Sequence, residues 1–292
     1  MPEGDTIFRA ATVLRRVLAG QVVTGFEITA PKVSAAVRDD EIVGSTVKAI
    51  ESNGKHLFIH FDTPHEVVLH THMKMSGSWH VYRPGERWWE PEKEARVVIR
   101  TANVVAPCFH PPIVELLAAK ELALHRVVGR LGPDIIRDDF DVDEALRRLR
   151  EKQDRDIATA LLDQSVISGI GNVFKVEALF LAKLSPWAPV RDLGDDQLRA
   201  VVAQARKLIR LNRSGGERRT RFSLDPSDRM WVDERAGLPC HVCGTRVEHG
   251  WHPGEDVRKS WYCPHCQNVK PEDVYRAAPV PAMQMPHRRE RL

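Results

Sequence analysis

Residues 240–266, CHVCGTRVEHGWHPGEDVRKSWYCPHC, carry the sharpest local signal in this 292-residue chain. Four cysteines form two C-x2-C pairs, Cys240 with Cys243 and Cys263 with Cys266, and nineteen residues separate the pairs. Each pair places two thiolates on a tight turn, and two such turns complete the tetrahedral S4 shell that Zn²⁺ prefers. The spacing therefore predicts one structural zinc ion in a small finger over residues 236–270. Two disulfides are the alternative, which a reducing compartment disfavours.

The predicted finger also carries a basic and aromatic arm. Arg258 and Lys259 precede the second cysteine pair and stand beside Trp261 and Tyr262. A hairpin of this size buries little surface by itself. We therefore expect it to present these side chains to a partner.

Upstream of the finger, the sequence has helical character from Asp141 onward. Four segments place apolar residues at helical spacing, namely 141–152, 156–163, 172–184 and 195–212. The segment SGIGNVF, residues 168–174, lies between the second and third of them. Gly169 and Gly171 permit a tight turn and Asn172 can cap the next helix, so the backbone amides there could receive a phosphate. A plain connector between two helices fits the same residues equally well.

The first 121 residues follow the period-two alternation that is typical of strands. In KHLFIHF, residues 55–61, apolar Leu57, Ile59 and Phe61 alternate with the residues between them. Similar runs occur at 21–28, 66–72, 77–82, 95–101 and 113–117. An amphipathic helix precedes them, with Asp5 as its expected N-cap.

These patterns predict an α+β protein of several domains. We expect a β-sandwich with a leading helix over 1–121, a linker over 122–134 and a helical domain over 135–235, followed by the finger. The last segment, 271–292, is rich in proline and basic residues and is expected to be a disordered tail.

Composition is that of an ordinary globular protein, with 42% hydrophobic and 28% charged residues. No apolar run approaches the ~20 residues that span a bilayer, and the N-terminus lacks the basic and apolar regions of a signal peptide. We therefore expect a cytoplasmic protein. Net charge is only +3, but the segment from Arg206 to Arg221 contains seven basic residues and one acidic residue. That run fits a polyanion-binding patch or a solvated helix face.

Five histidines lie on neighbouring strand-like segments: His56, His60, His70, His72 and His80. A β-sandwich metalloenzyme is the functional alternative for such a set. Alternation is expected to scatter these side chains over different faces, and no H-E-x-x-H segment supports a ligand set. We therefore expect no metal site among them.

The chain opens with MPEGDTIFRA. Initiator methionine is normally removed before a small residue, which would leave Pro2 with a free secondary amine. Such an amine can add to a sugar C1′ carbon, and loss of the leaving group then gives a cationic iminium. An α-amino group has a pKa of about 7.7–8.0, so part of it is unprotonated near neutrality. Glu3 beside it could protonate the departing group. A simple lead-in to the helix is the alternative.

Together these motifs are more specific than any one of them. MPEG, LGPD (131–134), DQSVISGIGN (163–172) and RKSWYCPHCQ (258–267) occur in this order, with NGKH (53–56) in the strand-rich half. From Met1 to about Gln267 the chain resembles the formamidopyrimidine-DNA glycosylase and endonuclease VIII family of base-excision repair enzymes. The resemblance implies a β-sandwich with a leading helix and a helix-two-turn-helix domain that carries a zinc finger. Duplex DNA would lie in the cleft between them.

The resemblance also implies roles for individual residues. Pro2 resembles the family's Schiff-base nucleophile, and Glu3 its general acid. Lys55 resembles the lysine that supports catalysis beside the lesion phosphate. Arg258 resembles the finger arginine that grips flanking phosphates and assists the second elimination. The expected DNA-binding residues are Asn172 as a phosphate ligand, Arg130 as another contact, and, in the gap-filling loop 72–79, Met75 as the wedge with Lys74 beside it.

We therefore expect a monomeric, bifunctional DNA glycosylase and AP lyase that cleaves damaged DNA by β,δ-elimination and holds one structural zinc ion. One alternative is a zinc-ribbon DNA-binding protein without catalysis, which would have no use for a processed Pro2. The other is a glycosylase of the formamidopyrimidine branch, which acts on 8-oxoguanine.

Three features favour the endonuclease VIII branch and oxidised pyrimidines. Residues 103–117 contain no arginine, whereas the formamidopyrimidine branch typically uses one there to read the opposite base. Gln164 rather than asparagine follows Asp163 before GIGN, and Ala158 stands where that branch often has a lysine. Opposite-base selectivity is then expected to be low, with bubbles and single strands accepted as well as duplex. Thr6 occupies a place where members commonly have a second acid, so the local pocket is expected to differ.

Overall fold

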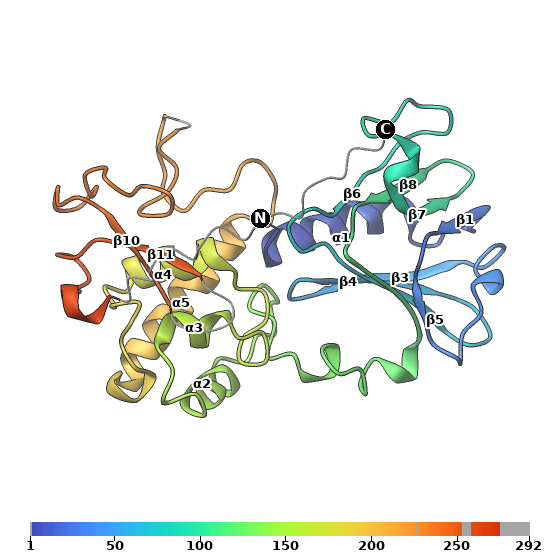
Figure 1. Ribbon diagram of the computed structural model, residues 1–292. Coiled ribbons are helices and arrows are strands. Elements are labelled where there is room, and N and C mark those ends of the chain that lie inside the picture. Colours follow the sequence, from blue (N-terminus) through green and yellow to red (C-terminus); the bar gives the residue numbers. More distant parts are fainter. Residues whose placement is uncertain (1, 226, 253–257, 275–292) are drawn as a thin grey trace, which may run out of the picture.

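The computed structural model describes residues 2–225, 227–252 and 258–274, which form a strand-rich half that includes the N-terminal helix and a helical half (Figure 1). That helix, α1, spans Gly4–Leu18. Its apolar side chains Ile7, Ala11, Leu14 and Leu18 are at most 1% exposed and belong to the core of the strand-rich half. The leading helix is thus confirmed. Its N-cap is Glu3 rather than Asp5, because the helix begins two residues earlier than expected.

Two sheets form the β-sandwich. The five-stranded sheet has the order β2 (Lys32–Val33), β9 (Ile113–Ala118), β5 (Val67–His72), β4 (His56–Phe61) and β3 (Val47–Asn53). The four-stranded sheet has the order β1 (Gly25–Ile28), β7 (Ala95–Arg100), β8 (Val105–Phe109) and β6 (Ser78–Trp79). Neighbouring strands are antiparallel except β2 and β9, which are parallel. Both sheets contribute buried side chains to one core, as a sandwich requires.

Burial does not follow the expected alternation in β4 and β5, where five of six residues are buried. Two strands that the sequence did not single out, β3 and β8, lack it as well. In β3 the pairing register shifts between Val47 and Ala49, so this bulge breaks the period-two pattern. In β8 all five residues are buried, so no polar residue alternates with the apolar ones. β6 is only two residues long, shorter than the 77–82 run.

The segment between the halves contacts both of them. The backbone N–H of Gly54, in the β3–β4 turn, donates to Oδ2 of Asp134 at 2.9 Å. The N–H of Ile135 donates to the carbonyl of Ser168 at 3.2 Å, and Ser168 Oγ donates to Oδ1 of Asn53 at 3.3 Å. The LGPD segment therefore fixes the β3–β4 turn against the helical half.

Four α-helices form the other half, at the segments that the sequence predicts: α2 (Val142–Arg150), α3 (Ile157–Leu162), α4 (Asn172–Leu181) and α5 (Asp195–Leu211). Asp141 and Asp156 cap α2 and α3 through their side chains. The apolar stripe of α5 packs against α4, and α3 closes the same core. Short 3-10 turns join the elements at Asp39–Glu41, Glu92–Glu94, Ala119–Glu121, Val128–Arg130, Val190–Asp192 and Pro271–Asp273.

The finger is a hairpin of β10 (Glu248–Trp251) and β11 (Lys259–Tyr262) that packs on α4. Val176 and Phe180 of α4 share a buried cluster with Cys240 and Cys263. The expected tail begins with an ordered turn at Pro271–Asp273, and its residues 275–292 lie outside the described part of the chain. Within the described residues, no helix has the length and apolar character needed to cross a membrane.

Candidate active site

Glu3 lies at the N-terminus of α4 and is fully buried, with 0% exposure. Its carboxylate accepts hydrogen bonds from the backbone N–H groups of Gly171 (3.0 Å), Val173 (2.9 Å) and Phe174 (3.4 Å). Amides of a helix's first turn have no partner within the helix, and they favour negative charge. One carboxylate from the start of α1 is therefore held by the start of α4.

This arrangement corrects two expectations about SGIGNVF. The amides of Gly171, Val173 and Phe174 are not left for a phosphate, because they donate to Glu3. Asn172 is the first residue of α4, and Gly171 is the N-cap. Gly171 has an ordinary extended backbone, and its need for glycine is spatial, since a Cβ there would lie 2.2 Å from Cδ of Glu3. Gly169, with φ of +100°, does adopt the expected left-handed turn.

The residues before α1 are fixed against the same turn. The N–H of Gly4 donates to the carbonyl of Gly169 at 2.9 Å, and a Cβ on Gly4 would lie 2.9 Å from Cα of Gly169. Pro2 is half-buried and is bonded directly to Glu3. The proline nitrogen is therefore held within one residue of a buried, oriented carboxylate.

Lys55 faces this carboxylate from the β3–β4 turn. Burial lowers the pKa of its amine, the positive charges of Arg258 and Arg218 lower it further, and the carboxylate of Glu3 opposes the shift. These electrostatic contacts show that Glu3, Lys55 and Arg258 lie near one another, although they come from α1, the sandwich and the finger. A lysine with a lowered pKa gives up its proton more readily than an ordinary one.

The predicted DNA-contact residues lie further out. Met75 is 73% exposed, and Lys74 beside it has φ of +42° and is also exposed. The N–H of Lys74 donates to Nδ1 of His72 at 3.0 Å. Burial is the main cause that lowers the pKa of His72, to about 4, and the charges of Lys55 and Lys74 add to the shift. The loop tip therefore protrudes beside the lysine of the site. Arg130 is exposed on a 3-10 turn of the linker.

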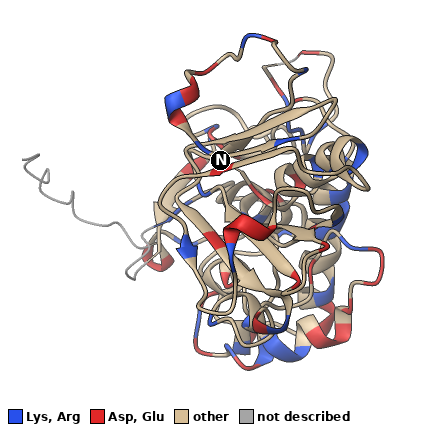
Figure 2. Ribbon diagram, turned by 90° about the vertical axis from the view of Figure 1, so that its right-hand side faces the viewer, with Lys and Arg blue, Asp and Glu red and all other residues tan. Residues whose placement is uncertain are grey.

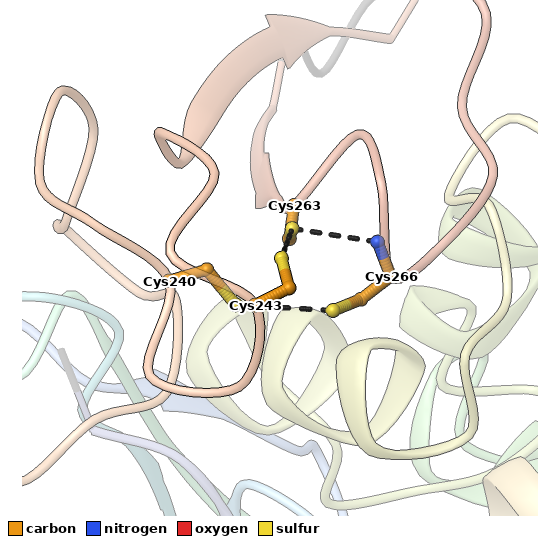
Figure 3. Close-up of side chains that lie close together, drawn as sticks. All are labelled: Cys240, Cys243, Cys263 and Cys266. Atoms are coloured by element: carbon orange, nitrogen blue, oxygen red, sulfur yellow. Dashed lines mark hydrogen bonds between the residues drawn. The ribbon is translucent and has the colours of Figure 1, made fainter.

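The four cysteine sulfurs face a common centre (Figure 3). Sγ of Cys240 lies 3.9 Å from Sγ of Cys266, and Sγ of Cys243 lies 3.4 Å from Sγ of Cys263. A disulfide requires ~2.05 Å, whereas tetrahedral Zn–S bonds of ~2.3 Å place sulfurs about 3.8 Å apart. Backbone N–H groups of Val242 and Cys266 donate to the first sulfur of each pair. The cluster could hold a metal ion, and the disulfide alternative does not fit these distances.

Comparison with known proteins agrees with this geometry. Family models for the formamidopyrimidine-DNA glycosylase N-terminal domain and H2TH domain match residues 1–112 and 131–221. "Probable endonuclease 8 2" of Streptomyces coelicolor is 38% identical, over 91% of this chain and 94% of the relative. "DNA-(apurinic or apyrimidinic site) lyase Nei2" of Mycolicibacterium smegmatis is 36% identical, over 92% of this chain and all of the relative. The chain belongs to the formamidopyrimidine-DNA glycosylase and endonuclease VIII family.

Solved structures show the same fold. Lactococcus lactis Fpg, in a complex with DNA that contains N7-benzyl-Fapy-dG, matches with a TM-score of 0.76 at 21% identity, over 92% of this chain and all of that chain. Its complex with DNA that contains an abasic site matches with a TM-score of 0.75 at 20% identity, with the same coverage. The predicted fold of a glycosylase of this family, with a strand-rich N-terminal domain and a helix-two-turn-helix domain, is thus confirmed.

Arg218 lies beside Glu3, although the sequence patterns did not single it out. Its guanidinium lies 2.7 Å from Oδ1 of Asp5 and 3.8 Å from Oε1 of Glu3, and it also donates to Thr6 Oγ1 at 3.1 Å. It also lies over the ring of Phe174, 5.0 Å from its centre. Asp5 thus supplies the second carboxylate that Thr6 does not. Nothing in the local sequence marks Arg218, because its partners lie more than 200 residues earlier.

The histidines are less scattered than expected. Strand pairing places His56 opposite His72 and next to His70, whose Nε2 lies 2.8 Å from Nδ1 of His56. Nδ1 of His70 and Nε2 of His125 lie 2.8 and 3.0 Å from Oε2 of Glu115. The expectation of scatter is therefore wrong for His56, His70 and His72. Their pairing follows from strand register, which the alternation alone does not give.

Glu115, His70 and His125 have donor atoms close enough for a metal ion. However, Nδ1 of His125 accepts a hydrogen bond from the backbone N–H of Val128 at 3.1 Å. A neutral imidazole with an accepting Nδ1 carries its proton on Nε2, which then cannot bind a metal. The cluster is therefore a hydrogen-bonded clamp between the linker and the sandwich. The hydrogen bond from His70 is the main cause that lowers the pKa of Glu115, to about 2.

The basic run from Arg206 to Arg221 does not form one patch. Arg210 pairs with Asp138, Arg218 with Asp5 and Arg221 with Asp228. Figure 2, in which the two halves overlap, shows aspartate and glutamate as well as lysine and arginine along the ribbon. Most of these arginines therefore fix internal contacts, although some face solvent.

Proposed function

We propose that this protein is a bifunctional DNA glycosylase and AP lyase of base-excision repair, with the amine of Pro2 as its nucleophile. The observation that carries the proposal is the placement of Glu3. A fully buried carboxylate accepts hydrogen bonds from amides at the start of α4, directly after Pro2, and both it and Arg258 act on the charge of Lys55. The names of the relatives, endonuclease 8 and apurinic or apyrimidinic site lyase, support the same reaction.

In this mechanism the Pro2 nitrogen, once Met1 is removed, attacks C1′ of the damaged nucleotide. The N-glycosidic bond breaks, its electron pair leaves with the base, and the base takes up a proton. Glu3 is the acid that protonates the departing group, and after ring opening the nitrogen forms a cationic iminium with C1′. The iminium acidifies the C2′–H bond, so a base removes that proton and the 3′ phosphate leaves. A second elimination releases the 5′ phosphate, with Lys55 and Arg258 beside the departing groups.

DNA would bind across both halves. Asn172 and Arg258 are the proposed phosphate contacts of the helical half and the finger, with Arg130 in the linker. Met75, exposed at the loop tip with Lys74 beside it, is the proposed wedge in the gap that the extruded base leaves. The four cysteines are proposed to bind one structural Zn²⁺, because four thiolates close the shell and the finger packs on α4 through two of them. We propose that the enzyme acts as a monomer.

We further propose oxidised pyrimidines as the main lesions. In the structure, residues 103–117 form β8, a tight turn and β9, so no long second loop is present there to read the opposite base. That segment also lacks an arginine. Cleavage of thymine glycol and of 8-oxoguanine opposite C, each in duplex and single-stranded form, tests this point. A clear preference for 8-oxoguanine in duplex alone would assign the enzyme to the formamidopyrimidine branch.

Borohydride trapping tests the reaction itself. Reduction during turnover should convert the iminium to a stable amine and join the protein to an abasic oligonucleotide, and mass analysis should place the link on Pro2. Intact mass should also show that Met1 is absent from the active protein. If Pro2→Gly traps as well as wild type while Lys55→Ala does not, a lysine is the nucleophile. A protein that retains Met1 and binds DNA without trapping would be a non-catalytic zinc-ribbon protein.

A further inference from the structure

Lys175 is a fully buried lysine of α4 that the mechanism above does not use. Its side chain is 0% exposed, one helical turn after Asn172. Nζ donates to Oδ1 of Asn172 at 2.8 Å and to the backbone carbonyl of Lys259, in β11, at 3.1 Å. A buried ammonium is costly unless it has specific partners. Here both partners are attached to proposed phosphate contacts, because Lys259 directly follows Arg258.

The first hydrogen bond fixes the orientation of the Asn172 amide. An ammonium has only donors, so asparagine must turn its oxygen toward Lys175. The Nδ2 amide donors of Asn172 then point away from Lys175. A phosphate accepts hydrogen bonds and has none to donate, so this is the orientation that binds DNA. Without Lys175 the amide could rotate by half a turn and present its oxygen to the phosphate.

The second hydrogen bond fixes the start of β11. Arg258 stands next to the anchored carbonyl, between that strand and residues 253–257, which lie outside the described part of the chain. The carbonyl of Arg258 also accepts from the N–H of His252 at 3.2 Å. The backbone that follows the Arg258 side chain is thus held twice, once by the N–H of His252 and once by Lys175 of α4.

We propose that Lys175 is a positioning residue that sets both DNA phosphate contacts at once, by orienting the Asn172 amide and by anchoring the finger strand beside Arg258. This inference rests on the proposed function, which supplies the roles of Asn172 and Arg258.

The ionisation of Lys175 gives this role a pH signature. Burial lowers the pKa of its amine to about 7, while Asp156, Asp233 and Glu3 oppose the shift and Arg258 adds to it. Asp233 faces it with a pKa raised to about 7 by burial and by Glu177, Glu234 and Glu3. A bound phosphate favours the protonated lysine, so DNA binding should take up a proton near neutral pH. Affinity should therefore fall as pH rises through about 7 to 9, while the lysine loses its proton.

The test uses the full-length zinc-loaded protein and a duplex with a stable abasic-site analogue. Lys175→Met keeps the length of the side chain and removes the ammonium, and Lys183→Met, at an exposed position just after α4, is the control that removes the same charge. We expect Lys175→Met to weaken binding by ~10-fold or more, and to reduce the slope of log affinity against log salt by one to two units. The zinc content and the thermal midpoint of Lys175→Met should equal those of Lys183→Met.

A second variant distinguishes the titration of Lys175 from that of Asp233. Lys175→Arg retains charge at all accessible pH values, so it should restore affinity and abolish the fall in affinity between pH 7 and 9. In an Asn172→Ala background, Lys175→Met should reduce DNA affinity by less than it does in wild type, because the Asn172 amide that Lys175 orients is already absent.

Three outcomes would overturn the proposal. Lys175→Met could bind with wild-type affinity and slope, its loss could match that of Lys183→Met, or it could lose zinc and unfold, in which case Lys175 serves the fold. A wild-type protein that binds this DNA but fails to trap with borohydride would sink the catalytic function and leave this inference standing.

Discussion

Replacement of Gly171 by alanine should displace Glu3 and disable base release while the fold remains. Gly171 is the N-cap of α4 with φ of −119°, a backbone that alanine adopts without strain. The added Cβ would lie 2.2 Å from Cδ, 2.4 Å from Cγ and 2.6 Å from Oε1 of Glu3. Ordinary contact begins near 3.4 Å, so the carboxylate must move by at least ~1.2 Å. Its hydrogen bonds to Gly171 and Val173, now 3.0 and 2.9 Å, would be lost or lengthened.

A displacement of about 1 Å at a reacting group can cost ~10²-fold in rate. We therefore expect single-turnover release of thymine glycol from duplex DNA to fall by about 10²-fold in Gly171→Ala. Cleavage of a preformed abasic site should fall by much less, because no base has to be protonated. Gly194→Ala is the matched control: Gly194 is the N-cap of α5, and the nearest atom to its added Cβ is 3.8 Å away. Both variants lose about 1 kcal/mol of capping. Gly171→Ala should lose a further ~1–3 kcal/mol from the hydrogen bonds of the buried carboxylate, so its thermal midpoint should be lower than that of the control while the protein stays folded.

The double variant Glu3→Ala with Gly171→Ala decides whether the clash acts through Glu3. The three nearest atoms to the added Cβ all lie beyond Cβ of Glu3, so Glu3→Ala removes them. Gly171→Ala should then add little to the loss already caused by Glu3→Ala. Wild-type base release in Gly171→Ala, or a full additive loss in the double variant, would show that the carboxylate on α4 is not the acid.

Glu3→Gln should keep its place on α4 but release bases ~10²–10⁴-fold more slowly, with a much smaller effect on preformed abasic sites; equal losses on both substrates would remove Glu3 from the acid role. Arg258→Ala should retain zinc, weaken DNA binding and reduce the log-log salt slope by roughly one unit, which titrations at several salt concentrations would measure. Glu115→Gln should lower the free energy of unfolding at pH 7 by about 1.5–3 kcal/mol, because its hydrogen bonds to two histidines are charge-assisted. The pKa of Glu115 falls from 4.5 to about 2 on folding, so this difference from wild type should be full above pH 4.5 and disappear as pH falls through 2; thermal unfolding at several pH values measures it.

The sequence predicts those parts of the site whose residues are close together in the chain. The two C-x2-C pairs need only their own spacing, because each pair lies on one tight turn. The helices after Asp141 follow from apolar periodicity, since each stripe faces one core. MPEG and GIGN are also visible in the sequence. The contact between these two motifs is not visible in the sequence, because Glu3 and Gly171 are 168 residues apart in the chain.

The contacts that the sequence does not predict are pairings between elements. Strand register brings His56, His70 and Glu115 together, and a single step of register would separate them. Arg218 lies in a run of basic residues whose members find acids in several different elements. Lys175 falls on a helix whose buried residues are apolar except for Glu177, and its contact with Lys259 in β11 depends on how the finger packs on that helix.

Each proposed catalytic group of this enzyme is carried by one part of the chain and oriented by another. Glu3 begins α1, yet the amides of α4 hold its carboxylate. Lys55 belongs to the sandwich, yet Asp134 from the LGPD segment holds the N–H of Gly54 beside it. Burial raises the pKa of Asp134, and the N–H groups of Gly54 and Ile136 offset part of that shift. The buried contacts therefore lie at the junction of the two halves, which must dock before Pro2, Glu3 and Lys55 can face one nucleotide. This explains why MPEG, NGKH, LGPD and GIGN are dispersed in the sequence although they form one site.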